Sequence, residues 1–477
     1  MKKTNLTLLA LLLFVCGSSR AQQMDSVSVA VDSAFVDSTM TVAANDIQNS
    51  DAIVSLYRKL YGLSKAAADG VVQKLNIVHI GDSHIQADLL TDKVRQNLQQ
   101  LFGNGGRGFV FPHNLAHTNG ASDVRFLSDQ KWQSYRNVSA AAAHKVGISG
   151  IALYSPSDDF TVEFFAKEAR NSFQTIKILT PGNSNSFAVA ISKKTAVYET
   201  VVPKRIVHKI RRGEALSTIA EKYKLSVAQL KKFNNLKSNT IRAGKSLRIP
   251  TSGTQTQLVS RPEFIPLEIR SDTISHYYTT AESLDRIYIL PNKAAADYVL
   301  SGLVLENDQP GILYHNIGVN GAKLSDYNKY ALFFEQLNAL SPDLIVIALG
   351  TNESFDHMET AAYMAQLELF LSNVRSRNPQ SAILVITPPP SLFRRREPNR
   401  FVAGYARKIS DMAVQYNYAV WDMFTQMGGL YNVNRNHRNG LMAADRIHYS
   451  KAGYELQGNL FSEALVQGYN SFKSNQQ

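Results

Sequence analysis

Short runs of apolar residues, separated by longer stretches with a helical period, dominate the first and last parts of the chain. The runs at residues 75–80 and 344–349 are rich in β-branched side chains and do not alternate with polar residues, which is typical of strands buried on both faces of a parallel sheet. The alternation of such strands with amphipathic helices predicts an α/β domain of three layers, flavodoxin-like in class. Further strands are expected at 312–319, 382–387 and 419–423, and helices at 88–102, 324–340, 360–377, 400–416 and 451–469, with another beginning at Ser50 or Asp51.

Between these two parts, the pattern changes to short strands separated by turns. Turn sequences such as Ser155-Pro156 and Pro181-Gly182 lie between the apolar segments. Short strands with regular turns are typical of an antiparallel β-sandwich, so a β-sandwich-like module is predicted to interrupt the α/β domain. Its strands are expected at 150–154, 160–165, 175–179, 186–191, 267–270 and 286–290.

Residues 206–250 form a smaller unit inside that β module. A strand, a turn, two helices at 216–223 and 227–233, and a strand at 246–249 give a βααβ order. The unit resembles a LysM domain over its whole length, although Glu214-Ala215 stands where that family often has Asp-Thr. The resemblance implies binding to peptidoglycan or another N-acetylglucosamine-containing glycan. The residues that carry it are Gly213, Leu216, Ile219, Ala220, Tyr223, Ser226, Leu230, Asn234, Leu236, Ile241, Gly244, Leu247 and Pro250.

The first 21 residues have the pattern of an export signal. A basic start is followed by an apolar stretch at residues 6–15, and Ala21 suits a cleavage site. Lipid attachment at Cys16 is the alternative. Residues 22–50 lack basic side chains and a clean period, which predicts a flexible acidic linker. Beyond the signal there is no cysteine and no apolar run of the ~18 residues that a membrane span needs, so we expect no disulfide, no thiolate site and no transmembrane segment.

The charge of the chain is concentrated in one place. The full sequence carries a net charge of +12, and residues 204–250 alone hold 13 Lys and Arg against two Glu. Outside this segment and the export signal the chain is slightly acidic. The basic balance therefore does not indicate a nucleic-acid partner, and it suits an anionic wall polymer at the LysM unit.

Candidate catalytic side chains lie where the predicted strands end. The first strand is followed by Gly-Asp-Ser-His and then a helix, so Ser83 is expected at the carboxyl edge of the sheet, where α/β proteins bind their ligands. A serine needs a base and an orienting acid, and Asp445, three residues before His448, can reach the imidazole locally. Gly321 and Asn352, each after another strand, offer an N–H and an amide to a developing oxyanion.

These four blocks, in this order, resemble the SGNH (GDSL-type) hydrolase family. The resemblance implies that Ser83 is the nucleophile, that Asp445 and His448 complete the triad, and that the Ser83 N–H, Gly321 and Asn352 form the oxyanion hole. It also implies the strand order 2-1-3-4-5. The first block reads Gly-Asp-Ser-His, as in peptidoglycan O-acetylesterase-like members, and the β module resembles carbohydrate-binding insertions of such esterases. No cofactor is expected, and no metal, because no His, Cys or carboxylate cluster has ligand spacing.

Several of these residues also have a structural interpretation. Ser83 alone would be interpreted as a helix cap, and Asn352 as part of an Asx turn, but the neighbouring blocks favour catalysis. Asp82 and Glu353 are expected to be structural, and His84 to be a core histidine.

The roles of Arg107 and of a run of three arginines remain open. Arg107, in a glycine-rich loop, either faces an anionic or sugar group or is solvated. The run Arg394-Arg395-Arg396 is expected to be a solvated face, with contact to an anionic glycan as the alternative.

The sequence predicts an exported serine esterase, periplasmic or extracellular and associated with the cell wall, which removes O-acetyl groups from peptidoglycan or a related glycan. One alternative is a peptidoglycan-binding anchor with an inactive hydrolase-like domain, and another is an SGNH esterase or lipase acting on another ester. The oligomeric state and the sugar position stay open, as does glycan binding by the β module. The predicted organisation is a signal peptide at 1–21, a linker at 22–50, a hydrolase domain at 51–120 and 302–477, a β module at 121–203 and 252–301, and a LysM domain at 204–251.

Overall fold

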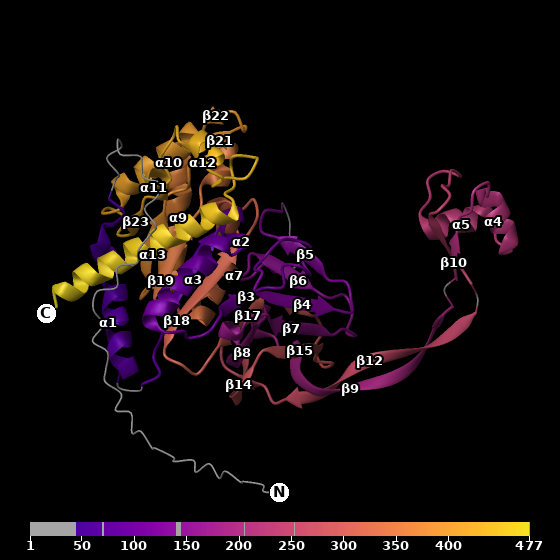
Figure 1. Cartoon of the computed structure of the whole chain (residues 1–477). Helices are drawn as coiled ribbons and strands as arrows, with labels where there is room; N and C mark the ends of the chain where they lie inside the picture. Colours follow the sequence, from indigo (N-terminus) through magenta and orange to yellow (C-terminus); the bar gives the residue numbers. More distant parts are fainter. Residues whose placement is uncertain (1–43, 69–70, 140–144, 205, 252, 477) are drawn as a thin grey trace, which may run out of the picture. The chain divides into compact units, whose positions relative to one another are not determined.

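The central feature of the fold is a mostly parallel sheet of six strands (Figure 1). The computed structural model describes residues 44–68, 71–139, 145–204, 206–251 and 253–476. The strand order is β1-β23-β20-β19-β2-β18, and only β1 is antiparallel to its neighbour. Without β1, the order in chain numbering is 2-1-3-4-5, as the family resemblance implied. The strands are β1 (Ile47–Gln48), β2 (Lys74–Gly81), β18 (Gly311–Gly318), β19 (Leu344–Ala348), β20 (Ala382–Ile386) and β23 (Ala419–Trp421).

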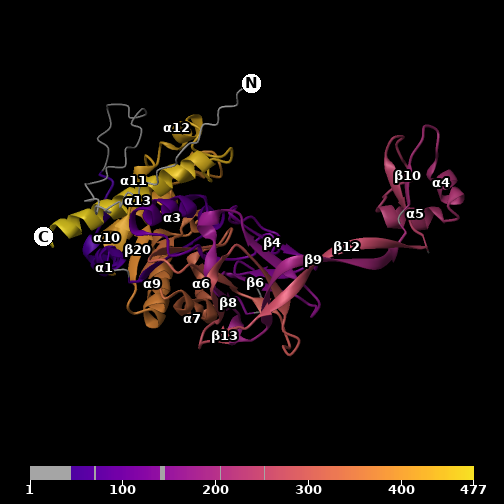
Figure 2. The ribbon, with the colours of Figure 1, turned by 60° about the horizontal axis from the view of Figure 1, so that its bottom comes forward.

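Helices cover both faces of this sheet. In β19, Leu344 and Val346 belong to one apolar core, whereas Ile345 and Ile347 belong to another, because successive side chains of a strand point to opposite faces. The first core is closed by α1 (Val54–Ala68), α3 (Leu89–Phe102) and α13 (Lys451–Ser474), and α13 lies against α3 (Figures 1 and 2). The second is closed by α7 (Ala331–Gln336), α9 (Thr360–Arg377) and α10 (Arg400–Met412), with α6 (Leu324–Asn328) against α9.

The remaining sheets are antiparallel. Two have five strands, in the orders β12-β9-β15-β7-β4 and β13-β14-β8-β17-β3, one has three, β16-β6-β5, and two have two strands each, β10-β11 and β21-β22. Side chains of the two larger sheets share a core, and the rings of Phe164 and Phe173 lie 5.9 Å apart between them. The strands are β3 (Gly108–Val110), β4 (Val124–Ser128), β5 (Gln133–Arg136), β6 (Ile151–Tyr154), β7 (Val162–Ala166), β8 (Phe173–Leu179), β9 (Phe187–Pro203), β12 (Thr254–Leu267), β13 (Arg270–Ser271), β14 (His276–Leu284), β15 (Arg286–Pro291), β16 (Val299–Leu300) and β17 (Gly302–Glu306).

The LysM region has the expected βααβ order. Strands β10 (Ile206–Lys209) and β11 (Ser246–Ile249) pair in antiparallel register and enclose α4 (Leu216–Lys222) and α5 (Val227–Asn234). The unit has its own small core, which includes Leu216, Ile219, Leu230 and Leu247. In the chain it interrupts β9 and β12, which pair from Pro203 and Thr254 onward as a long ribbon (Figure 2).

The amino-terminal boundary differs from the prediction. The expected signal peptide and most of the linker lie outside the described residues, but Ile47 and Gln48 form a strand of the central sheet. Ile47 pairs with Trp421, and the Asn45 side chain accepts a hydrogen bond from Trp421 Nε1 at 3.0 Å and donates to Leu460 O at 2.9 Å. The linker prediction is therefore wrong at its carboxyl end, because side-chain amide contacts rather than an apolar period hold this segment.

Other differences follow from short elements that have no readable period. Strands β3 and β17 lie in ranges assigned to the hydrolase domain, yet both join the second antiparallel sheet. The described helices are not long and apolar enough to cross a membrane. The 3-10 turns η1 (Ser50–Ile53) and η4 (Leu337–Leu340) lie in ranges predicted as helix. Elements without a prediction include the strands β1, β3, β4, β5, β14, β16 and β17, and also α2 (Ser83–Gln86), α8 (Thr351–Phe355), α11 (Met423–Gln426), α12 (Val433–Arg438), β21 (Leu392–Phe393), β22 (Glu397–Pro398), η2 (Ala169–Asn171) and η3 (Pro181–Asn183).

Candidate active site

Strand β2 delivers Ser83 to the carboxyl edge of the central sheet. At Gly81 a Cβ atom would lie 2.8 Å from the carbonyl oxygen of Ala348 in β19, so a side chain does not fit where the strand ends. Asp82 then caps α2, and its Oδ1 accepts the N–H of His84 at 2.9 Å. Ser83 is the first residue of this one-turn helix and is half-buried.

Ser83, His448 and Asp445 form a continuous chain of hydrogen bonds. Ser83 Oγ lies 2.9 Å from His448 Nε2, and His448 Nδ1 lies 2.7 Å from Asp445 Oδ2. The second oxygen of Asp445 accepts the backbone N–H groups of Ile447 and His448, each at 3.0 Å. Asp445 thus fixes both the loop and the ring, and it favours the tautomer in which Nε2 can accept the proton of the serine hydroxyl.

A cavity of about 590 Å³ opens in front of the serine. Ser83, Gly321, Asn352 and His448 all line it. The side chain of His448 is 40% exposed and that of Asp445 is 25% exposed, so an incoming ester can reach the imidazole. The structure therefore brings together, around one cavity, the residues that the sequence singled out in four separate segments.

The N–H of Gly321 and the side-chain amide of Asn352 differ in whether they already have hydrogen-bond acceptors. Gly321 has φ +83, a conformation that favours glycine, and its N–H has no backbone acceptor within the described part of the chain. The amide Nδ2 of Asn352 donates to the carbonyl of Ala322 at 3.0 Å and to Asp82 Oδ2 at 3.2 Å. Donation by Asn352 to an oxyanion therefore requires the longer bond to Asp82 to be shared or released.

The two carboxyl groups of the site have opposite pKa shifts. Burial raises the pKa of Asp445, but the hydrogen bonds from His448 and from the backbone outweigh it and hold this pKa below its usual range. Burial raises the pKa of Asp82 to about 7, although the N–H of His84 and the charge of His448 act in the opposite direction. Asp445 is thus ionised at neutral pH and can stabilise an imidazolium, whereas Asp82 lies near the midpoint of its titration.

His84 is a core histidine, as predicted. Burial lowers its pKa to about 3, and its Nδ1 lies 3.0 Å from the hydroxyl of Tyr454. Its ring centroid is 5.2 Å from that of His448. His84 therefore packs against the His448 ring and is 5% exposed.

Both interpretations of Arg107 are wrong. The side chain is neither solvated nor free to face an anion, because it is 1% exposed and its guanidinium contacts Asp88 and Asp123. The neighbouring glycines predict a loop but carry no information about which carboxylates the loop meets.

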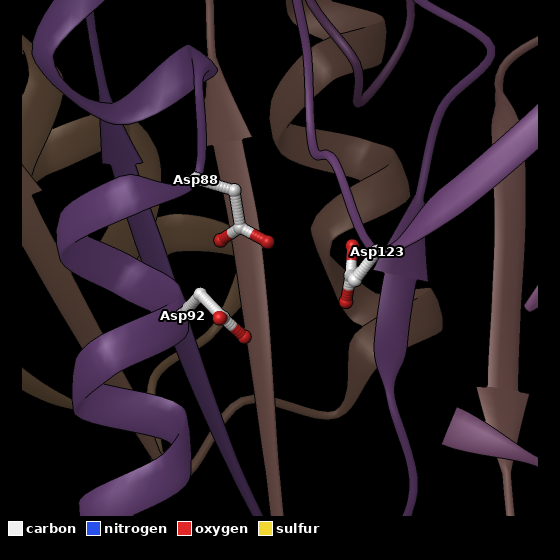
Figure 3. Close-up of side chains that lie close together, drawn as sticks. All are labelled: Asp88, Asp92 and Asp123. Atoms are coloured by element: carbon white, nitrogen blue, oxygen red, sulfur yellow. The ribbon is translucent and has the colours of Figure 1, made fainter. Parts of the chain in front are cut away.

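Asp88, Asp92 and Asp123 form an acidic cluster whose oxygens lie within 4.8 Å of one another (Figure 3). Guanidinium groups already occupy it, since Arg95 binds Asp88 at 2.8 Å and Asp92 at 2.9 Å, and Arg107 binds Asp123 at 2.6 Å. Burial raises the pKa of Asp123, but the charge of Arg107 outweighs it and the net shift is downward. The chemistry of the cluster is thus that of a buried ion-pair network rather than a cation site.

This network stabilises the segment that carries Ser83. The side chain of Asn316, at the end of β18, donates to Ile85 O in α2 at 2.7 Å and to Asp88 Oδ1 at 2.9 Å. Because Arg95 and Arg107 hold Asp88 in turn, the turn after Ser83 is fixed from two sides.

The sequence did not indicate four further residues that line the cavity. Tyr454 comes from the first turn of α13, and Phe355 from the end of α8. Asn119 and Asn320 face each other, and the Nδ2 of Asn320 donates to Asn119 Oδ1 at 2.6 Å. Tyr454 and Phe355 lie shortly after predicted site residues, so proximity in the chain was an available signal for them, whereas nothing pointed to Asn119.

The chain carries a GDSL/SGNH hydrolase domain and a LysM domain: residues 288–456 match the GDSL-like Lipase/Acylhydrolase family, and residues 208–250 match the LysM domain. The first match includes Gly321, Asn352, Asp445 and His448 but begins within β15 of the β module, so Ser83 lies outside it.

Individual proteins resemble this chain over parts of its length. An endolysin of Bacillus phage B103 is 35% identical over 91 residues, which is 19% of this chain and 35% of the endolysin. The N-acetylmuramoyl-L-alanine amidase sle1 of Staphylococcus aureus (strain USA300) is 28% identical over 110 residues, 23% of this chain and 31% of the amidase. The chain thus spans about a third of the length of these curated relatives.

One solved structure resembles the chain over most of its length. It is described as "Peptidoglycan O-acetylesterase in action, 5 min", and it aligns with 89% of this chain and 99% of its own at a TM-score of 0.59 and 20% identity. At this identity the likeness establishes an SGNH-like fold.

Proposed function

We propose that the protein is a serine esterase that removes O-acetyl groups from peptidoglycan and that its LysM domain holds it on this polymer. The observation that carries the proposal is the hydrogen-bonded chain from Ser83 through His448 to Asp445, open to a cavity of about 590 Å³. A solvent-accessible imidazole between a hydroxyl and an ionised carboxylate is suited to acyl transfer.

The reaction has two halves. Ser83 Oγ attacks the acetyl carbonyl while its proton moves to His448 Nε2, and Asp445 stabilises the imidazolium. The tetrahedral oxyanion is held by the N–H groups of Ser83 and Gly321 and by the Asn352 amide, each such donor being worth about 2.7–4 kcal/mol. His448 returns the proton to the departing sugar oxygen. Water activated by His448 then attacks the acetyl-serine, which releases acetate and restores the hydroxyl.

Two features support a polymeric glycan as substrate. The LysM domain supplies a separate glycan-binding unit on the same chain, and tethering to the polymer raises the local concentration of esters at the active site. His448 lines the cavity and its side chain is 40% exposed, which suits a small acyl group on a large carrier. Together with the predicted export signal, these features favour action at the cell wall.

Acetate release is the decisive measurement. Purified protein is incubated with O-acetylated peptidoglycan and with the same material after mild alkaline de-acetylation, and free acetate is assayed enzymatically. We expect release from the first only, and none from the Ser83→Ala variant. Hydrolysis of aryl acetate without release from the polymer would indicate another ester, and failure on both would leave the anchor alternative.

The role of the LysM domain has its own test. Residues 204–250 are deleted, and binding to purified sacculi is compared with that of the full chain. We expect binding to be lost while aryl acetate hydrolysis is retained, because the two units have separate cores. Unchanged binding would remove the targeting role.

A further inference from the structure

A hairpin beside the catalytic cavity carries the three arginines whose role the sequence left open. It consists of β21 and β22 and the turn between them, residues 392–398, and we call it the arginine hairpin. Its Leu392 N–H donates to the carbonyl of Arg446, between Asp445 and His448, at 3.1 Å. Asn399, which follows the hairpin, donates through Nδ2 to Ser354 Oγ in α8 at 2.8 Å. The hairpin is thus attached to the loop that carries Asp445 and His448 and to α8, which carries Asn352.

A strip of aromatic rings connects the cavity to the arginines. Phe355 lines the cavity, and its ring is stacked on that of Phe393, with centroids 6.0 Å apart and planes at 30°. The guanidinium of Arg394 lies over the ring of Phe393, 5.3 Å from its centroid. Cation–π contact of this kind holds a guanidinium in place while leaving its N–H groups available.

The turn of the hairpin is made by residues that do not favour it. Arg394 and Arg395 have φ +49 and φ +62, the left-handed region that Gly and Asn normally fill in hairpin turns. Two adjacent side-chain-bearing residues in this region are uncommon, and such exceptions concentrate at sites where the side chain has a function. The arginines therefore occupy the turn against local backbone preference.

The charge of these arginines is not neutralised locally. Arg394, Arg395 and Arg396 are exposed, and among the described residues none of them forms an ion pair with a carboxylate. Glu397 is the only acidic residue in the hairpin. Outside the LysM unit and the export signal the chain is slightly acidic, so the hairpin is a local concentration of positive charge.

We propose that the arginine hairpin binds carboxylate groups of the substrate that lie beyond the ester, namely those of the peptide stems of peptidoglycan. The Phe355 ring, which lines the cavity, can cover the apolar face of a sugar, and the planar guanidinium groups match carboxylates in a two-point contact. The hairpin thereby distinguishes peptide-bearing glycan from bare glycan. This inference rests on the proposed function and specifies its substrate class.

The test compares three substrates and two variants of the full chain. The substrates are 4-nitrophenyl acetate, O-acetylated peptidoglycan with intact stems, and the same polymer after removal of the stems by an amidase. The hairpin variant is Arg394→Gln, Arg395→Gln and Arg396→Gln together. The matched control removes three exposed cations elsewhere, Lys131→Gln, Arg407→Gln and Lys408→Gln.

The measured quantity is the rate of acetate release from each polymer divided by kcat/KM on the aryl ester. For the hairpin variant we expect this ratio to fall about tenfold on the polymer with stems, since exposed arginine–carboxylate pairs contribute modestly but add up. On the polymer without stems, wild type and variant should give the same ratio. Added NaCl should lower the wild-type ratio on the intact polymer more than that of the variant.

The outcomes separate this inference from the proposed function. Equal ratios for wild type and hairpin variant on the intact polymer, or an equal fall in the control, would overturn the role of the hairpin while the esterase stands. Aryl acetate hydrolysis without acetate release from either polymer would overturn the proposed function and the hairpin with it. A loss on the stem-free polymer as large as on the intact one would assign the hairpin to the sugar rather than to carboxylates.

Discussion

Two groups of charged side chains originate from the same stretch of chain, residues 82–95, and they have opposite properties. In one, Ser83 joins His448 and Asp445, and the imidazole is 40% exposed toward a cavity. In the other, Asp88 and Arg95 are 3% and 0% exposed and meet further carboxylates and guanidinium groups. Both groups contain short hydrogen bonds and residues with shifted pKa values. Neither feature by itself therefore distinguishes a reactive site from a structural one.

The two groups differ in whether their polar atoms can still form a hydrogen bond with an incoming molecule. Each oxygen of Asp88 already receives a guanidinium or amide donor, and no incoming molecule can reach it. In the group around Ser83, His448 Nε2 is bonded, among the described residues, only to a hydroxyl that can give up its proton. A cluster is a candidate for chemistry when a bond can be exchanged with a ligand, and a structural one when every bond is internal.

The largest expected effect is on catalysis, for Ser83→Ala. We expect kcat on aryl acetate to fall about 10⁴-fold or more, because the triad acts as a unit. The melting temperature should hardly change, since Ser83 Oγ bonds only to His448 among the described side chains. Activity and thermal unfolding are measured on the same preparation, and residual activity near the wild-type value would contradict the assignment.

The next effect is on stability, for Asp123→Ala. Removing this carboxylate leaves the buried Arg107 short of a partner, and we expect a loss of about 3–5 kcal/mol in the free energy of unfolding. Urea denaturation measures it. The matched change Asp158→Ala, in an exposed ion pair with Lys293, should cost less than about 0.5 kcal/mol. Similar losses for both variants would show that the buried ion pairs around Asp123 contribute no more to stability than an exposed pair does.

Asn352→Ala should lower kcat while leaving the fold intact. We expect a fall of about 10²–10³-fold with little change in KM, as for other single oxyanion donors. Asn119→Ala changes another amide that lines the cavity and should have a much smaller effect on kcat. Equal losses for the two variants would mean that Asn352 shapes the cavity and does not act on the oxyanion.

Glu353→Gln should change how stability depends on pH. Burial raises the pKa of Glu353 to about 8, although the N–H of Leu324 acts against it. Because the folded-state pKa lies above the unfolded one, its stabilising contribution is complete below about pH 4.5 and is lost as the pH rises through about 8. Between pH 5 and 8, wild type should lose about 3–4 kcal/mol relative to the variant, because each pH unit between the two pKa values costs about 1.4 kcal/mol. The exposed Glu268→Gln should show no such trend in urea denaturation.

The smallest expected effect is that of metal removal. Guanidinium groups occupy the positions around Asp88, Asp92 and Asp123 that a cation would need. We therefore expect the thermal midpoint to be the same in EDTA and in millimolar Ca²⁺ or Mg²⁺. A rise of several degrees with either ion would indicate that the network admits a cation.

The sequence was informative where one physical signal dominated. Unalternating apolar runs predicted the strands of the parallel sheet, and the βααβ order predicted the LysM elements almost residue by residue. The spacing of Asp445 and His448 predicted a local contact, and they are in fact linked at 2.7 Å. The meeting of these two with Ser83, 365 positions away from His448, depended on family order rather than on local pattern.

The sequence was uninformative where partners are distant and local propensity is neutral. Arg107 and Asp123 form an ion pair that no periodicity encodes. Strand β1 has two residues and depends on the Asn45 and Trp421 side chains. The length of β9 and β12 was missed because each stabilises the other, and neither shows a buried face by itself.

The pairing of Pro203 with Thr254 has a practical consequence for engineering. The two cut ends that excision of the LysM unit would create are already opposite each other in a hairpin register. An Asn-Gly dipeptide should rejoin them as an ordinary tight turn without disturbing the ribbon. The LysM unit can accordingly be replaced as a whole. Other carbohydrate-binding domains whose termini lie close together could be inserted at the same position to change the polymer that the protein binds.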